Sequence, residues 1–151
     1  MPRLEFFIVA RSFAADKFTN RLSLFDIFET VQPIRFPAVI PRMVAMSAWH
    51  YGNAEERQEQ FQATVIIKMP GPEEDVIINT NFENPGILHH TVAGVSNTIV
   101  SRPGTIEIEL KLNGEHQAFH RIQVVEANDK QIDDGSLLYP GSNEQQEAKA
   151  E

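Results

Sequence analysis

Cysteine is absent from this chain of 151 residues. Its absence excludes disulfide bonds, thiolate nucleophiles and zinc sites built on cysteine. No apolar run approaches the ~18 residues that a membrane-spanning helix needs. A signal peptide is not expected either, because Arg3 and Glu5 alternate with Leu4 and Phe6 from the start, as in a strand. With no targeting segment recognised, we expect a cytoplasmic protein.

Recognisable catalytic and cofactor motifs are also missing. The chain has no Gly-x-Ser-x-Gly elbow, no phosphate-cradling glycine loop, no dinucleotide fingerprint and no His-Glu-x-x-His pair. We therefore assign no catalytic, cofactor-binding or metal-ligating residue and predict no cofactor. An enzyme is less favoured than a binding protein.

Positive charge is sparse, and no basic stripe is present. The formal net charge is −8, and the 13 lysines and arginines are scattered singly. Binding to phosphates needs clustered basic side chains. Nucleic acid and anionic membranes are therefore not expected partners, and the mild acidity serves solubility.

What the sequence does contain is the pattern of an antiparallel β-sheet. In residues 106–112, isoleucine and leucine alternate with charged side chains, and Asn113-Gly114 follows as a turn, which is typical of a hairpin. A two-residue loop would leave Ile122 and Val124 facing solvent. A three-residue loop ending in Gly114 at positive φ, with a bulge, would pair Ile108 with Ala118 and bury both. We therefore expect the bulged loop.

Turn signals at Pro70-Gly71-Pro72, Pro85-Gly86, Pro103-Gly104 and Asn113-Gly114 divide the chain into short runs rich in valine, isoleucine, phenylalanine and threonine. Such spacing predicts an all-β fold, a mainly antiparallel sandwich of seven or eight strands, immunoglobulin-like or related. The expected strands are Leu4–Arg11, Arg21–Glu29, Arg42–Tyr51, Phe61–Met69, Val76–Phe82, one within His90–Val100, and the two strands of the hairpin.

Two segments do not follow the strand pattern. Three prolines in residues 33–41 predict an extended crossover, because proline is not expected in a central strand. We expect Ile34, Phe36, Val39 and Ile40 to pack under it. From Asn128 the periodicity stops and the composition turns polar and acidic. We expect a sandwich domain over residues 1–127 and an acidic, disordered tail over residues 128–151.

The five histidines do not have metal-ligand spacing. His89 and His90 are adjacent and would point to opposite faces of a strand. His116 and His120 share a face but would lie about 13 Å apart along it. For His120 we expect a hydrogen-bonded sheet histidine, and the carboxylates Glu107 and Glu109 are expected on the exposed face of the hairpin.

Two further segments have polar or aromatic side chains within otherwise apolar strands. Asp26 shares the parity of an apolar face, so it needs a partner, for which Arg21, Arg42 or a backbone nest could serve. Trp49, His50 and Tyr51 close the third expected strand, and aromatic side chains at a strand end can contact a ligand or protein. These three are the candidate binding residues, and the alternative for Trp49 is core packing.

Two segments resemble a known family. NRLSLFDIFETVQPIRFPAVIPRMVAMSAWH (residues 20–50) and RPGTIEIELKLNGEHQAFHRIQV (residues 102–124) are similar to the most characteristic stretches of a family of small bacterial proteins, a domain of unknown function. The resemblance covers most of residues 3–125 and none of the acidic tail. It implies a compact β-sandwich and a bacterial or phage-borne origin, and it supplies no catalytic residues.

The sequence thus favours a binding or interaction module. The alternatives are a small-ligand or metal-dependent enzyme with a site in a sandwich cleft, and a structural or assembly subunit of a larger complex. We expect a protein partner or self-association through an exposed sheet edge. The strand from Arg42 to Tyr51 is the candidate edge.

Overall fold

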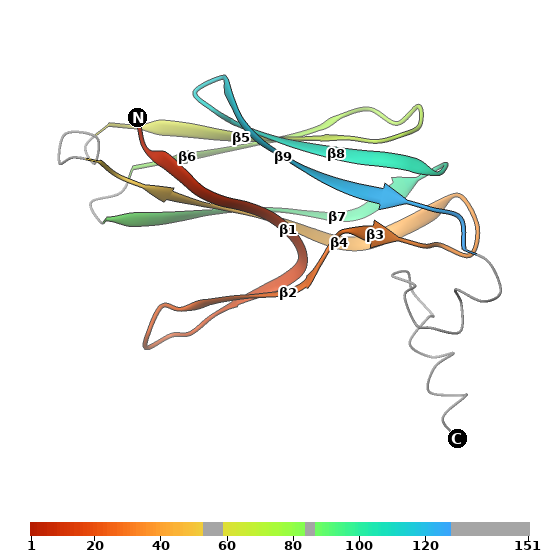
Figure 1. Cartoon of the computed structure of the whole chain (residues 1–151), viewed down its shortest axis with the longest axis horizontal. Helices are drawn as coiled ribbons and strands as arrows, with labels where there is room; N and C mark the ends of the chain where they lie inside the picture. The colour runs from red at the N-terminus through yellow and green to blue at the C-terminus, as the bar shows by residue number, and fades with distance from the viewer. Residues whose placement is uncertain (53–58, 84–86, 128–151) are drawn as a thin grey trace.

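The alternating apolar pattern takes the form of nine strands in the computed structural model, which describes residues 1–52, 59–83 and 87–127 (Figure 1). None of these residues is helical, so they provide no helix that could cross a membrane. In chain order the strands are β1 (Arg3–Ala15), β2 (Leu22–Ile27), β3 (Thr30–Val31), β4 (Ala38–His50), β5 (Phe61–Lys68), β6 (Val76–Phe82), β7 (Leu88–Val100), β8 (Gly104–Leu112) and β9 (Glu115–Val124).

The strands form two packed sheets, which confirms the predicted all-β sandwich. One sheet has the order β2-β1-β4-β7, and the other has the order β3-β9-β8-β5-β6. All neighbours are antiparallel except β3 and β9. The ninth strand was not expected because β3 has only two residues, too few to show an alternating pattern.

The core lies between the sheets and follows the alternation of the strands. Phe61, Ala63, Val65 and Ile67 of β5 are buried, as are Ile106, Ile108, Leu110 and Leu112 of β8. Burial of one such large apolar side chain contributes about 1.5–3 kcal/mol. The inward face of each strand therefore stabilises the sandwich.

The β8–β9 hairpin differs from the expected register. Asn113 (φ 49°) and Gly114 (φ 83°) both have positive φ, and Leu112 pairs with Glu115, so the loop has two residues. The register shifts between Lys111 and Leu110, and Gln117 is the extra residue of the bulge. The predicted pairing of Ile108 with Ala118 is therefore wrong, since Ile108 pairs with His120.

The expected burial in this hairpin is nevertheless confirmed, because Ile122 and Val124 both lie in the core. A slip of one residue moves every side chain to the opposite face. The chain makes this slip within β9 and not in the loop.

The proline-containing segment also differs from expectation. Residues 38–41 form the start of β4, which begins at Ala38 and not at Arg42. Pro41 is tolerated because β1 pairs with β4 only from Val44 onward, so β4 has one partner here, as in an edge strand. The Phe36–Pro37 peptide bond just before β4 is cis.

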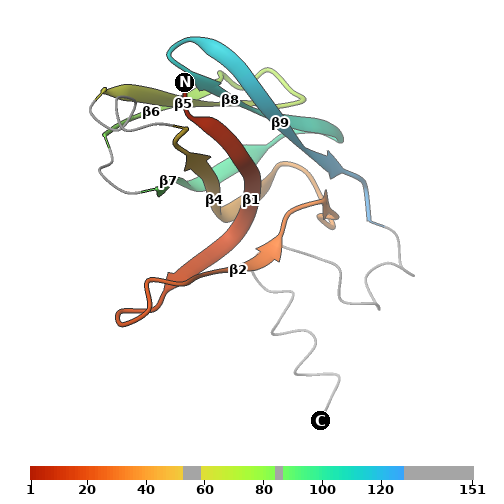
Figure 2. The ribbon, with the colours of Figure 1, turned by 60° about the vertical axis from the view of Figure 1, so that its left-hand side comes forward.

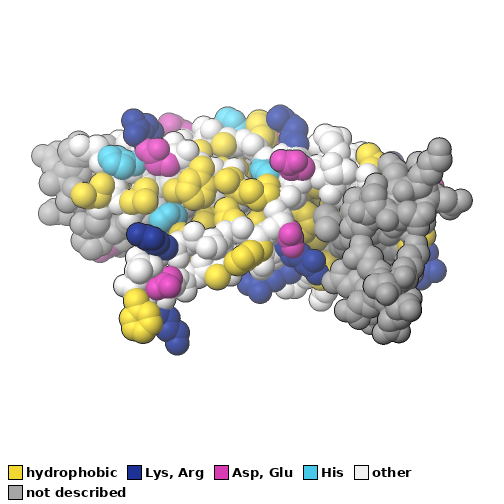
Figure 3. Space-filling view, turned by 60° about the horizontal axis from the view of Figure 1, so that its bottom comes forward, with side chains coloured by type: hydrophobic (Ala, Val, Ile, Leu, Met, Phe, Trp, Pro, Cys, Tyr) yellow, Lys and Arg dark blue, Asp and Glu magenta, His cyan; other side chains and the backbone are white. Residues whose placement is uncertain are grey.

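The outer face of the four-stranded sheet is also apolar. Val44, Met46 and Ala48 of β4 are buried there, and Ile8 and Phe6 of β1 lie beside them in register. After Ala10, β1 leaves β4 and bends with β2 into a hairpin that lies beneath this face (Figures 1 and 2). Figure 3 shows a band of hydrophobic side chains across the middle of the molecule on this side, with histidines along its border.

Candidate functional site

Trp49, His50 and Tyr51, the candidate binding residues from the sequence, lie at the end of β4. Trp49 is fully buried at 0% exposure, and its indole N–H donates to the Ser47 hydroxyl over 2.9 Å. Tyr51 is buried against Phe61, with ring centroids 6.1 Å apart. The two aromatic side chains are therefore core residues, and His50 is the part-exposed member of the three.

His89 and His90 of β7 point to opposite faces of the sheet, as predicted. His89 stacks on Phe82 of the other sheet, with ring centroids 4.7 Å apart and an interplanar angle of 9°. His90 lies on the outer face against Phe6, at 6.2 Å between centroids. Burial lowers the pKa of both imidazoles, and nearby His90 lowers the pKa of His89 further. Burial therefore favours the neutral form of both rings.

His116 and His120 of β9 serve local structure. His120 Nε2 lies 2.6 Å from the carbonyl oxygen of Phe28, so this residue is the predicted hydrogen-bonded sheet histidine. His116 Nδ1 lies 2.7 Å from a carboxylate oxygen of Glu109. Glu109 is buried, and the expectation that it faces solvent is wrong. No three potential metal ligands converge within the described part of the chain.

Asp26 is not on a buried face. It has a positive φ of 55°, which interrupts the alternation of β2, and its side chain is 66% exposed. Its charged neighbour is Arg11, at 3.9 Å, rather than the expected Arg21 or Arg42. An exposed pair of this kind contributes at most about 1 kcal/mol. Asp26 is thus a surface residue of a bent hairpin.

The strand predicted to be a free edge is in fact central. β4 pairs with β7 along nearly its whole length, and with β1 from Val44 to His50. The expectation that Arg42–Tyr51 forms an exposed edge is therefore wrong. β1 and β7 pair with β4 on its two sides, and the sequence of β4 itself does not show which strands pair with it.

The two outermost strands of this sheet are β2 and β7 instead. β7 pairs with β4 on one side, and no described strand pairs with its other side. We define the β7 edge as that outer side over residues 90–100. β7 contains no charged residue and no proline, the features that usually protect an edge strand from pairing. The neighbouring edge strand of the other sheet, β6, also lacks charge and proline.

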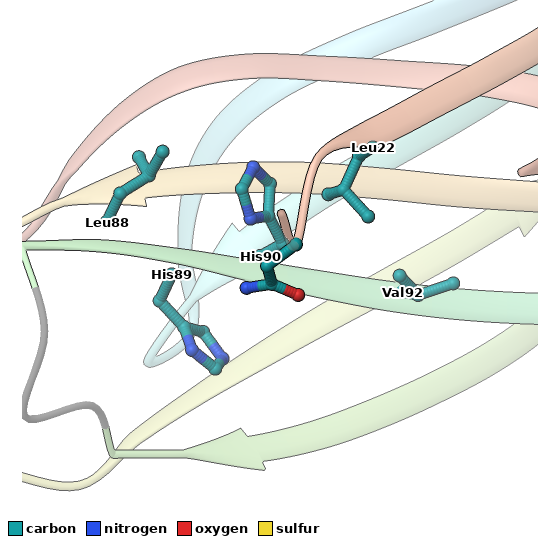
Figure 4. A pocket seen from close by; sticks show the side chains of 6 residues that line it. Leu22, Leu88, His89, His90 and Val92 are labelled. Atoms are coloured by element: carbon teal, nitrogen blue, oxygen red, sulfur yellow. The ribbon is translucent and has the colours of Figure 1, made fainter. Parts of the chain in front are cut away.

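A pocket of about 380 Å³ lies on the outer face beside β7. We call it the hairpin pocket, because the β1–β2 hairpin forms one wall and β7 forms the other. Figure 4 shows Leu88 and His90 on one side of β7, with His90 between Leu88 and Leu22, and His89 on the opposite side. Its lining residues are Asn20, Leu22, Leu88, His89, His90 and Val92.

A second hollow, of about 250 Å³, lies between the turn after β5 and the C-terminal half of β7. We call it the side hollow. Its lining includes Met69, Glu73, Glu74, Val76, Val95 and Thr98. The β7 edge is therefore accompanied by a hollow on each side, one on the outer face and one toward the interior.

One feature of the sequence marks the strand that forms this edge. Residues 87–100 form a run of 14 residues without a charged side chain, in a chain in which 23% of residues are charged. Such a run predicts strand but does not tell a buried central strand from an unprotected edge. Only the strand order makes that distinction.

Comparisons with known proteins give a family and no activity. The model of a family of unknown function (DUF6941) matches residues 5–125, which include both segments that carry the sequence resemblance. No match was found among curated proteins. Among solved structures, a β-glucosidase from Erythrobacter marinus matches with 12% identity and a TM-score of 0.40, over 79% of this chain and 15% of its own. A likeness this weak carries no argument about function.

Proposed function

Because this chain belongs to a family of unknown function (DUF6941), its function has to be inferred from its own geometry, and we propose that it is a protein-interaction module. The module binds an extended segment of a partner protein as an additional strand on the β7 edge. The observation that carries the proposal is that this outermost strand is 13 residues long and has neither charge nor proline.

Strand addition would use the main chain for affinity and the two hollows for specificity. Each new backbone hydrogen bond contributes about 0.5–1.5 kcal/mol, so a segment that spans several residues of β7 gains several such terms. Side chains of an added strand alternate between the two faces of the sheet. One set would reach the hairpin pocket beside His90, and the other would reach the side hollow beside Val95.

A protein segment fits this edge better than a nucleic acid does. β7 offers no cation, and the chain as a whole carries a net charge of −8. A second copy of the chain could also pair with β7, which would make the protein an assembly subunit.

The test starts from a displayed library of random ten-residue peptides, selected on the full-length chain. We expect selected peptides to slow deuterium exchange of the backbone amides in residues 90–100. Each selected peptide is then resynthesised with single backbone N-methyl groups. In an added strand only every second N–H points to the neighbour, so loss of binding should alternate along the peptide.

As a control, the same N-methylated peptides are tested for binding to an unrelated protein. This control excludes the possibility that N-methylation changes binding only through the solubility of the peptide. Uniform effects of N-methylation, or protection from exchange confined to other strands, would contradict strand addition. If no peptide is selected and light scattering shows a monomer at all concentrations, the proposal is also wrong. A concentration-dependent dimer with protected residues 90–100 would identify a second copy as the added strand.

A further inference from the structure

The side hollow combines apolar walls with carboxylates at its rim. Met69, Val76 and Val95 supply aliphatic surface from three different strands or strand ends. Glu73 and Glu74 lie in the turn between β5 and β6, at the same hollow. A ligand that fits both parts needs an aliphatic body and a positive end.

Thr98 gives the hollow a second polar feature. The residue is 8% exposed, and its hydroxyl oxygen has no hydrogen-bond partner among the described residues. Native proteins rarely leave a buried hydroxyl unpaired, because the lost hydration costs about 1–3 kcal/mol. A donor supplied by a ligand in the hollow would satisfy this oxygen.

The backbone of β7 directs both Val95 and Thr98 toward this hollow. Asn97 between them has a positive φ of 55°, which interrupts the alternation, so Val95 and Thr98 lie on the same inward side. A strand paired with the β7 edge would direct its own inward side chains beside them. The hollow therefore lies where an added strand would place a side chain.

We propose that the side hollow binds a lysine side chain of the added strand. The four-carbon stem would pack on Met69, Val76 and Val95, as lysine stems commonly do on apolar surface. The three N–H donors of the ammonium group would be shared between the rim carboxylates and the Thr98 hydroxyl. This inference rests on the proposed function, since the lysine arrives on a strand bound to β7.

The charges around the hollow favour a cation. The Ser101 hydroxyl beside Glu73 is the main group that lowers the pKa of this carboxyl, so Glu73 is ionised at neutral pH. Asp75 adds a third acid in the same turn. Arg102 acts on Glu73 through space, but no ion pair joins them in the described part of the chain. The overall charge of −8 also attracts a basic partner.

The test compares three versions of a selected peptide on the full-length chain, with lysine, norleucine or glutamate at the residue facing the hollow. Norleucine keeps the stem of lysine and removes its charge. We expect norleucine to weaken binding about tenfold and glutamate to weaken it more, as for a charge-assisted contact. The double variant Glu73→Gln/Glu74→Gln should lose the preference for lysine over norleucine, and Thr98→Val should reduce it.

The matched control is Glu115→Gln/Glu126→Gln, which removes two exposed charges outside the hollow. It should keep the lysine preference. If the control loses the preference as the rim variant does, or if norleucine binds as tightly as lysine at every inward position, the lysine site is wrong. Protection of residues 90–100 by the same peptides then separates this failure from failure of strand addition.

Discussion

Asn97 lies opposite Pro41 across the β4–β7 ladder, between the pairs Ile40–Thr98 and Arg42–Ser96. At this point the buried side changes in both strands. Ile40, before Pro41 in the chain, and Met43 and Ala45, after it, all point into the core. In a regular strand, Ile40 and Met43 would point to opposite faces, because their positions differ by three. A residue at positive φ and a proline together thus reset the faces of two paired strands, and they do so beside the side hollow.

This relationship makes Asn97 sensitive to its side chain. Its φ of 55° is in the left-handed region, which asparagine and glycine tolerate and β-branched residues do not. We expect Asn97→Val to lower the free energy of unfolding by about 1–2 kcal/mol. Asn97→Gly is the matched control and should change it by less than about 1 kcal/mol. Urea denaturation measures both, and equal effects would contradict a backbone origin.

Gly114 provides a similar test in the β8–β9 loop. Its φ of 83° confirms the predicted positive value, and no atom lies near enough to obstruct a Cβ. Gly114→Val should therefore destabilise the protein through the backbone alone, by about 1 kcal/mol or more. Gly94→Val in β7 is the control, because the φ of Gly94 lies outside the left-handed region and an added Cβ would make only an ordinary contact, 4.0 Å from the Met43 carbonyl oxygen. The loop assignment would be wrong if the two substitutions had the same effect on the urea midpoint.

Thr98 tests the buried hydroxyl without a ligand. Thr98→Val keeps the shape of the side chain and removes an oxygen that has no partner in the described structure. In the absence of peptide we expect unfolding free energy to stay the same or to rise by up to about 1 kcal/mol. Thr91→Val is the contrast, because the Thr91 hydroxyl is hydrogen-bonded to Ser47, and it should destabilise. A loss of stability in Thr98→Val would indicate a partner that the hydroxyl already has.

The pH dependence of stability follows from the two histidines of β7. Burial lowers the pKa of His89 and His90, so the unfolded chain binds more protons than the folded chain below the usual histidine pKa of about 6.5. Stability is therefore complete above that pH and falls as the pH drops through the lowered folded pKa values. Thermal melts between pH 7.5 and 5 should show this decline.

The variant His89→Phe separates this effect from other titrations. It keeps an aromatic ring on Phe82 and removes one proton-binding site, so its stability should fall less steeply over the same range. The carboxyls of Glu5, Asp16 and Glu73 also have lowered pKa values, which destabilise the fold in acid, but at a pH nearer 4. An unchanged slope between pH 7.5 and 5 in the variant would contradict the assignment to His89.

The alternation of apolar and polar residues was enough to predict the strands. A strand with one solvent-exposed face and one buried face alternates with a period of two, as Ile106 to Leu112 do. This alternation was not enough for relations between strands. The bulge at Gln117 allows Ile122 to be buried against the other sheet, and the residues of the loop give no indication of this bulge. The edge position of β7 depends on which strands pair with β4, so the candidate site could not be predicted from the sequence.

The domain boundary near Ala127 is the last prediction. The β9 strand ends at Val124, but the backbone N–H of Val125 still donates to the Val31 carbonyl over 3.0 Å, and that of Ala127 to the Pro33 carbonyl over 3.3 Å.

Residues 128–151 lie outside the described part of the chain. A chain that ends at Ala127 keeps all of these bonds and every core residue of the described part of the chain, so its melting temperature should stay within about 3 °C of the full-length value. Calorimetry of the two chains at equal concentration measures the difference. A larger fall would mean that the apolar residues Leu137, Leu138 and Tyr139 stabilise the sandwich, and Leu137→Ser/Leu138→Ser in the full-length chain should then reproduce it.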